Sequence, residues 1–174
     1  MRELDAALGE LADARKVSRT VTALHIASAT TLAASLSSSL ARWAKAHALG
    51  RTILVVDDDA AAGATLAHAL RHVAPVTLVC DVDAAVRVLA RDRPAVVVTD
   101  HHLDDVRGRT GATLLASSPR GPRAVLLSGI ADDHALAEAA RTVDAVPVAR
   151  PVTLAQLDAL VETVRALFKD ATGT

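Results

Sequence analysis

The chain has 174 residues and a formal net charge of −1, with one Phe, one Trp and no Tyr. This length allows one ordinary domain plus an appendage, and the near neutrality argues against a surface that grips polyanions. The scarcity of aromatic residues leaves no platforms on which single-stranded nucleic acid could stack. The only cysteine, Cys80, excludes a disulfide framework and a cysteine-based zinc site, and we expect it to be buried in a reducing cytosol.

Residues 1–49 contain no proline and no strand-like run. Their apolar residues recur at helical spacing and predict two helices, at roughly 2–26 and 29–48. Each helix would carry one apolar stripe that it cannot bury alone, so we interpret 1–49 as a helical hairpin for interaction or dimerisation. The segment 21–41 lacks charged residues but is too rich in Ser and Thr to span a membrane. We therefore expect a soluble, cytoplasmic protein.

A DNA-binding helix-turn-helix in 1–49 is a weaker interpretation of the same segment. Arg42 and Lys45 follow a Leu- and Ser-rich stretch, but no glycine marks a turn. Basic residues are also too few on any one face to hold a phosphate backbone. We consider nucleic acid an improbable partner.

From residue 51 onward the chain alternates between strand-like and helix-like segments. The strands are expected at 52–56, 76–79, 95–99, 124–127 and 144–148. The helices are expected at about 60–73, after Asp81, around 109–117, and at 132–142 and 153–168. Right-handed crossovers then predict an α/β fold, a doubly wound sheet of five parallel strands over 51–170. Few residues follow the last helix, so we expect no output domain after it.

Reactive residues follow the strands at their carboxyl ends. Asp57, Asp58 and Asp59 end the first strand, and Asp100 ends the third. Carboxyl ends of parallel strands meet at one edge of a sheet, where ligands bind. Several carboxylates placed together repel one another unless a cation compensates. Oxygen-only ligands favour Mg²⁺ over Zn²⁺, so we predict a magnesium site here.

Five ordered motifs resemble those of the receiver domains of two-component response regulators. They are Ile53-Leu54-Val55-Val56-Asp57-Asp58-Asp59, Val97-Val98-Thr99-Asp100, Gly108, Leu126-Leu127-Ser128-Gly129 and Arg150-Pro151. The resemblance covers residues 51–170. It implies a flavodoxin-like fold with strand order 2-1-3-4-5. It also implies a response regulator that takes part in phosphorelay signal transduction, without catalysing turnover of a separate substrate.

The resemblance also implies roles for individual residues. Asp100 would accept a phosphoryl group from a sensor histidine kinase, a phosphotransfer protein or a small phosphodonor. Asp58 would bind Mg²⁺ directly and Asp57 through water, with the backbone carbonyl of His102 as a further ligand. Ser128 would hydrogen-bond the phosphoryl group, in keeping with the needs of phosphoryl transfer.

Two residues depart from the family pattern. Arg150 stands where the family has lysine, and its planar guanidinium can pair with an unmodified carboxylate through two hydrogen bonds. Pro147 stands where the family has an aromatic residue that rotates during switching. These departures leave open a phosphorylation-independent pseudo-receiver that acts as an assembly module. In either case we expect a downstream protein partner on residues 1–49 or on the face made by 132–142, 144–148 and 153–168.

A remote alternative is a manganese phosphoesterase of the DHH family. Thr99-Asp100-His101-His102-Leu103 resembles one of its motifs. Such enzymes need a second substrate domain, which nothing after Asp100 supplies. We also expect His101 and His102 to project to opposite sides of an extended chain, which would make them a poor chelating pair.

Overall fold

The computed structural model describes residues 2–118, 121–129 and 134–173. The chain divides into two compact units, Met1–Ala44 and Lys45–Thr174, which we describe separately. Within the described ranges, no helix combines the length and the apolar character that a membrane span requires.

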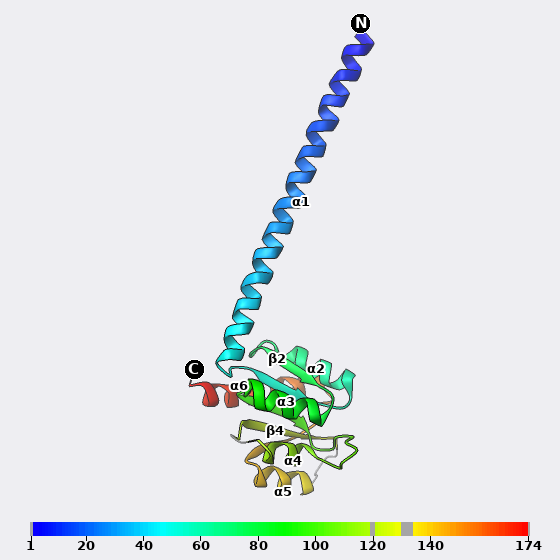
Figure 1. Cartoon of the computed structure of the whole chain (residues 1–174). Coiled ribbons are helices and arrows are strands. Elements are labelled where there is room, and N and C mark those ends of the chain that lie inside the picture. Colours follow the sequence, from blue (N-terminus) through cyan, green and yellow to red (C-terminus); the bar gives the residue numbers. More distant parts are fainter. Residues whose placement is uncertain (1, 119–120, 130–133, 174) are drawn as a thin grey trace. The chain divides into compact units, whose positions relative to one another are not determined.

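The N-terminal segment forms one helix, α1 (Arg2–Ala48), and the expected hairpin of two helices is wrong (Figure 1). The chain around Ala27 and Ser28 holds no proline or glycine that would interrupt a helix. The Thr30 hydroxyl donates to the carbonyl of Ile26 at 2.8 Å, and Thr31 donates to Ala27 at 2.9 Å. These hydroxyls thus find partners within the helix, so the polar residues do not break it. A helix-turn-helix has no basis in such a segment.

The end of α1 has a defined cap. The amide of Arg51 donates to the carbonyl of Ala46 at 2.8 Å, and Gly50 has a φ of +65°. A left-handed glycine with such a bond is a common helix stop. A side chain at Gly50 would also meet the Arg93 carbonyl oxygen at 2.8 Å.

The second unit is built on a sheet of five parallel strands in the order β2-β1-β3-β4-β5. This confirms the predicted doubly wound α/β fold. The strands are β1 (Ile53–Val56), β2 (Val76–Val79), β3 (Val96–Asp100), β4 (Arg123–Ser128) and β5 (Ala145–Ala149). The helices are α2 (Ala60–Leu70), α3 (Val82–Asp92), α4 (Gly111–Ala116), α5 (His134–Thr142) and α6 (Leu154–Thr172).

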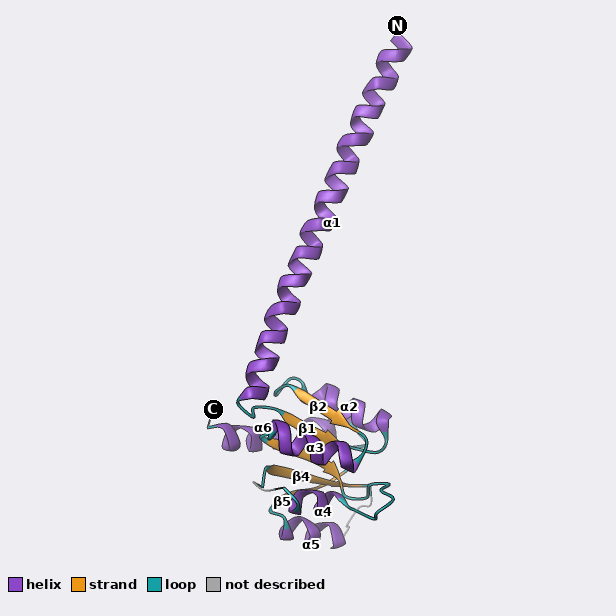
Figure 2. Ribbon diagram, in the orientation of Figure 1, coloured by secondary structure: helices purple, strands orange, loops and turns teal. Residues whose placement is uncertain are grey.

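Helices cover both faces of the sheet, which explains the continuous apolar runs of the central strands (Figure 2). Buried residues of α3, α4 and α5 pack on one face, around Leu54 and Leu126. Buried residues of α2 and α6 pack on the other face, around Val55 and Leu127. Alternate residues of each strand therefore enter different layers of the core.

The predicted elements exist, and their ends shift by a few residues. The strand at 144–148 and the helix at 153–168 become Ala145–Ala149 and Leu154–Thr172. Asp132 and Asp133, expected to open a helix, lie outside the described residues. Cys80 is exposed, not buried, because it follows β2 at the edge of the sheet.

Gly111 fixes the position of Asp100. A Cβ atom at Gly111 would lie 2.1 Å from the Asp100 carbonyl oxygen and 2.9 Å from Cδ1 of Leu126. The Gly111 amide donates to the carbonyl of His101 at 3.1 Å. The start of α4 therefore rests directly on the end of β3, which only glycine allows.

We expect Gly111→Ala to destabilise the domain by about 2–3 kcal/mol, because the added methyl group must displace backbone. Urea unfolding measures the effect. Gly121→Ala is the matched control, since no described residue lies within 4 Å of a Cβ there, and its cost should stay within about 0.5 kcal/mol. Equal costs for both variants would contradict the close packing of Gly111 on Asp100.

Candidate functional site

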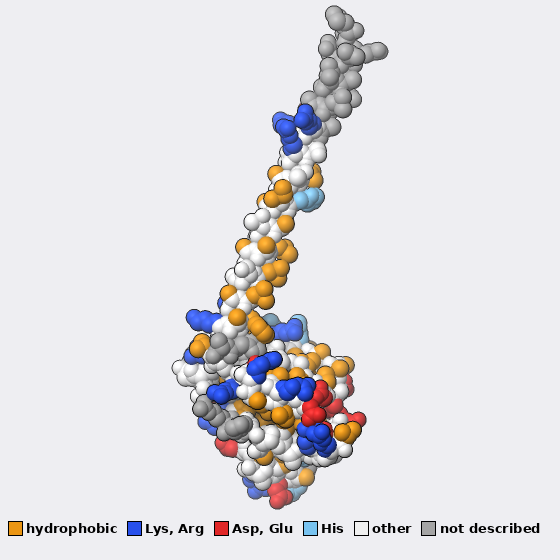
Figure 3. Space-filling view, viewed as in Figure 1, with side chains coloured by type: hydrophobic (Ala, Val, Ile, Leu, Met, Phe, Trp, Pro, Cys, Tyr) orange, Lys and Arg blue, Asp and Glu red, His pale blue; other side chains and the backbone are white. Residues whose placement is uncertain are grey.

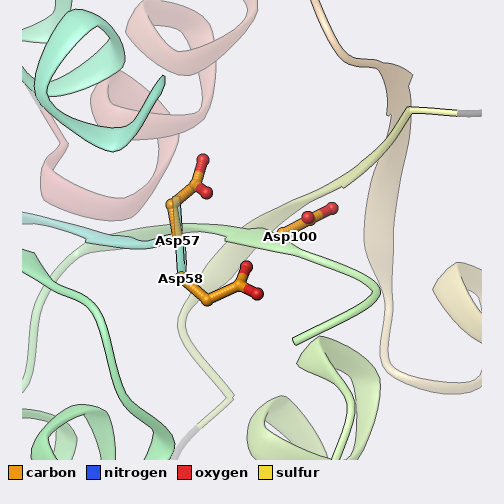
Figure 4. Close-up of side chains that lie close together, drawn as sticks. All are labelled: Asp57, Asp58 and Asp100. Carbon is orange, nitrogen blue, oxygen red and sulfur yellow. The ribbon is translucent and has the colours of Figure 1, made fainter. Parts of the chain in front are cut away.

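Three carboxylates meet at the carboxyl edge of the sheet. Asp57 and Asp58 follow β1 and Asp100 ends β3, and one oxygen from each can be chosen so that all three lie within 4.8 Å of one another. Figure 4 shows the three side chains grouped around one region beside the strand ends. Asp57 is fully buried, Asp100 is 9% exposed, and Asp58 is exposed. The sequence predicted this cluster.

Asp59 has a structural role. Its side chain accepts hydrogen bonds from the amides of Ala61 and Ala62, at 2.9 and 3.1 Å, and caps α2. Asp58 instead accepts a hydrogen bond at 3.1 Å from the amide of Asp104, in the loop after β3. Asp58 therefore joins the ends of β1 and β3 while it stays accessible from solvent.

Arg150 joins the two buried carboxylates. Its Nη2 donates to Asp100 Oδ2 at 2.6 Å and to Asp57 Oδ1 at 3.3 Å. Its Nη1 lies 3.0 Å from Asp57 Oδ2, an ion pair. The Arg150 amide donates to the carbonyl of Ser128 at 2.7 Å, which fixes the start of this side chain beside β4. The guanidinium thus places a positive charge between the two buried carboxylates.

Burial and charge act in opposite directions on these groups. Burial raises the pKa of Asp57, while the hydrogen bond and the positive charge of Arg150 offset part of that rise. Burial lowers the pKa of Arg150, but its contacts with Asp57 and Asp100 outweigh this and raise it overall. Arg150 therefore stays charged at any physiological pH.

The donor set fits Mg²⁺. Every candidate ligand atom in the cluster is a carboxylate oxygen, and such hard donors suit this ion. Asp100 Oδ1 is buried and has no hydrogen-bond partner among the described residues. A buried carboxylate oxygen without a partner carries a desolvation cost that a cation or a phosphoryl group would relieve. Asp57, Asp58 and Asp100 would hold the ion.

The other predicted site residues lie at the same edge. Ser128 is the last residue of β4 and is fully buried. His102 lies in the bend directly after β3, where its carbonyl stays the predicted further ligand. Pro147 lies in β5, at the edge of the sheet, paired with Leu126. An edge strand tolerates a residue that has no amide proton.

The expected opposite projection of His101 and His102 is wrong. Their ring centroids lie 4.6 Å apart in an edge-to-face arrangement, because the chain bends immediately after β3. His101 is buried and His102 is exposed. Among the described residues, the cluster that could hold a metal contains neither ring. The motif that resembled a phosphoesterase therefore supplies no histidine ligand to the acidic site.

Sequence reasoning missed a network that shapes the loop after β3. Arg109 makes a two-pronged contact with Asp105, with N–O distances of 3.0 and 2.7 Å, and reaches Asp83 of α3 at 2.8 Å. The hydrogen bond from Arg109 lowers the pKa of Asp105 and that of Asp83. The close Asp105/Arg109 spacing is visible in the sequence, but the distant partner Asp83 is not. This network anchors the loop that carries Asp104.

Comparisons with known proteins agree on the fold. No protein-family model matches the sequence, and a search of curated proteins finds no significant match. Solved structures do match. The receiver domain of the Francisella response regulator 1452 is 19% identical with a TM-score of 0.59, over 68% of this chain and 97% of that one. A CheY-like receiver domain protein from Methanospirillum hungatei JF-1 is 18% identical with a TM-score of 0.59, over 69% and 94%.

A third match is the BeF3-activated DrrB receiver domain. It is 20% identical with a TM-score of 0.56, and the alignment covers 68% of this chain and 97% of that one. The second unit has the receiver fold. The aligned share of this chain is close to that of the second unit, and the receiver domains are matched over nearly their whole length.

Removal of the Arg150 charge should destabilise the domain in the absence of divalent cations. We expect Arg150→Ala to cost about 2 kcal/mol at pH 8, because two buried carboxylates lose their counterion. The pKa of Asp57 would rise further above its usual value of 3.8. A carboxyl group whose pKa is raised in the folded state contributes stability that is fully present below pH 3.8. This stability is lost as the pH rises through the folded-state pKa. The deficit should therefore grow between pH 5 and pH 8.

Urea unfolding in EDTA at the two pH values measures this deficit. Arg87→Ala is the control, because Arg87 is an exposed arginine of α3. Its effect should be small at both pH values. A deficit of Arg150→Ala that stays constant with pH would contradict the charge-pairing role.

Proposed function

We propose that the domain is a response-regulator receiver that accepts a phosphoryl group on Asp100 in a Mg²⁺-dependent reaction. The observation that carries the proposal is the placement of Asp100. Its carboxylate ends β3, one oxygen is held by Arg150, and the buried Oδ1 has no hydrogen bond among the described residues. Two further carboxylates and a cation surround it. This is the arrangement that phosphoryl transfer to a carboxylate requires.

In the proposed reaction, Asp100 Oδ1 attacks the phosphorus atom of an acyl phosphate or a phosphohistidine. A new bond forms between Oδ1 and phosphorus, the bond from phosphorus to the donor breaks, and the donor leaves with that electron pair. When bound, Mg²⁺ would neutralise charge on the transferred phosphoryl oxygens. Arg150 holds the other oxygen of Asp100, which orients the carboxylate and adds positive charge at the same place.

Ser128 and Gly129 would accommodate the phosphoryl group on Asp100. Ser128 lies at the end of β4, one residue beyond the partner of Asp100 in the sheet. Its hydroxyl would hydrogen-bond a phosphoryl oxygen. Among the described residues, nothing lies within 4 Å of a Cβ built at Gly129, so its lack of a side chain would leave room for the phosphoryl group.

We expect the intact protein to gain the mass of one phosphate after incubation with Mg²⁺ and acetyl phosphate, measured by mass spectrometry. Asp100→Asn removes the nucleophilic oxygen and should gain none. Omission of Mg²⁺ should slow the gain by at least tenfold, since the charge on the phosphoryl group is then poorly neutralised. Equal gain in the Asn variant would place the acceptor elsewhere.

A second candidate is a phosphorylation-independent receiver that serves as an assembly module. The double contact of Arg150 favours it, because the guanidinium already compensates Asp57 and Asp100. Before Asp57 and Asp100 can bind Mg²⁺ or a phosphoryl group, Arg150 must then break some of its contacts with them. Pro147 also favours the assembly module, because its side chain cannot rotate as the family's aromatic residue does during switching.

Arg150→Lys separates the two candidates. Lysine keeps one positive charge but loses the second prong, so we expect Mg²⁺ to bind at least threefold more tightly to this variant, measured by calorimetry. Phosphorylation of both the unmodified chain and the Arg150→Lys variant would support the phosphoryl-accepting receiver. Mg²⁺ binding without phosphorylation of the unmodified chain, together with a gain of phosphate in Arg150→Lys, would support the assembly module.

The proposed partners follow from this chemistry. A sensor histidine kinase or a phosphotransfer protein would supply the phosphoryl group. A downstream protein would contact α1 or the face formed by α5, β5 and α6. We place this signalling in the cytoplasm.

A further inference from the structure

Helix α1 carries a continuous apolar stripe along the part whose side chains the structure describes. Its positions recur every three or four residues, so neighbouring members lie side by side and the stripe winds slowly around the helix. The stripe consists of Val17, Val21, Leu24, Leu32, Leu36, Leu40 and Trp43, with Ser28 at the one remaining position. Each of the seven apolar residues is between 47% and 66% exposed. Figure 3 shows apolar side chains along this helix.

The residues of α1 beside the stripe would not repel a second helix packed against it. No charged residue occurs between Thr20 and Ala41. The hydroxyls of Thr22, Thr30 and Thr31 donate to backbone carbonyls of the helix itself, so they need no outside partner. By helical spacing, Lys16 and Arg19 lie on the side away from the stripe.

The stripe offers enough area for a stable dimer. Full burial of a large apolar side chain is worth about 1.5–3 kcal/mol, which corresponds to roughly 100 Å² for each one. Seven such residues on each of two helices remove on the order of 1,000–1,500 Å² from water, which reaches the size of specific interfaces. Such an area exceeds the scattered apolar exposure of an ordinary monomer surface.

The pattern of the stripe also complements itself. In a parallel pair each residue meets its own counterpart. In an antiparallel pair centred near Thr30, Val17 lies opposite Trp43 and Leu24 lies opposite Leu36. In the parallel pair, apolar residues meet apolar residues at every position of the stripe except Ser28. In the antiparallel pair, Val21 lies opposite Ser39 and Leu40 lies opposite Thr20, so the parallel pair matches the stripe better. A two-fold interface needs such self-complementarity.

We propose that α1 pairs with the same stripe of a second copy of this chain, so that the protein is a homodimer through residues 17–43. This pairing does not depend on phosphorylation or on Mg²⁺. It goes beyond the proposed receiver function because it assigns the appendage its own partner. The alternative occupants of the stripe, the chain's own second unit or a different protein, are outcomes of the test.

The test is the mass of the full chain in solution by analytical ultracentrifugation from 1 to 100 µM. We expect a concentration-dependent shift from one copy of 18.0 kDa to two copies. Trp43 is the only Trp and the chain has no Tyr, so its emission reports on the stripe directly. Its emission maximum should shift to shorter wavelength over the same concentration range.

The paired variants are Leu24→Glu with Leu36→Glu, on the stripe, and Ala23→Glu with Ala34→Glu, off it. Both add the same two charges to the same helix, and Glu is a good helix former. The first pair should weaken dimerisation by at least a hundredfold and the second by less than threefold. The proposal is overturned by a monomer at 100 µM, by an assembly larger than two copies, or by a dimer that survives the first pair.

Discussion

The contact of Arg150 with Asp57 and Asp100 is the interaction on which the site depends. Two carboxylates at the ends of β1 and β3 are buried, and a buried charge is costly unless it is paired. The guanidinium lies against both, with distances of 3.0 and 2.6 Å. Arg150 therefore holds the two strand ends close together at the edge of the sheet.

Other local contacts hold the residues of this site in place at the strand ends. Gly111 lets α4 rest on the carbonyl of Asp100, and Asp59 caps α2 beside β1. Asp58 reaches across to the amide of Asp104 in the loop after β3. The first two contacts join a strand end to the helix that follows it, and the third joins the ends of two neighbouring strands. The acidic cluster thus belongs to the packing of the domain and is not a loose group of surface charges.

The appendage and the sheet follow different physical rules. The second unit buries its apolar residues within itself, in two layers on the sheet. Helix α1 leaves a stripe of large apolar residues at least 47% exposed. The homodimer proposed above would bury this stripe, and tertiary packing of this kind stabilises helices more than propensity does.

The sequence by itself determined the alternation of five strands and five helices, and it placed Asp57, Asp58 and Asp100 at strand ends. Apolar periodicity and local caps are short-range signals, so they are legible along the chain. Tertiary structure alone decided that Arg150 touches Asp57 across 93 positions and that Arg109 reaches Asp83. The single helix at 2–48 was missed although the sequence holds no proline or glycine around Ala27 and Ser28 that would interrupt it. Contacts between distant residues depend on packing, which local patterns do not specify.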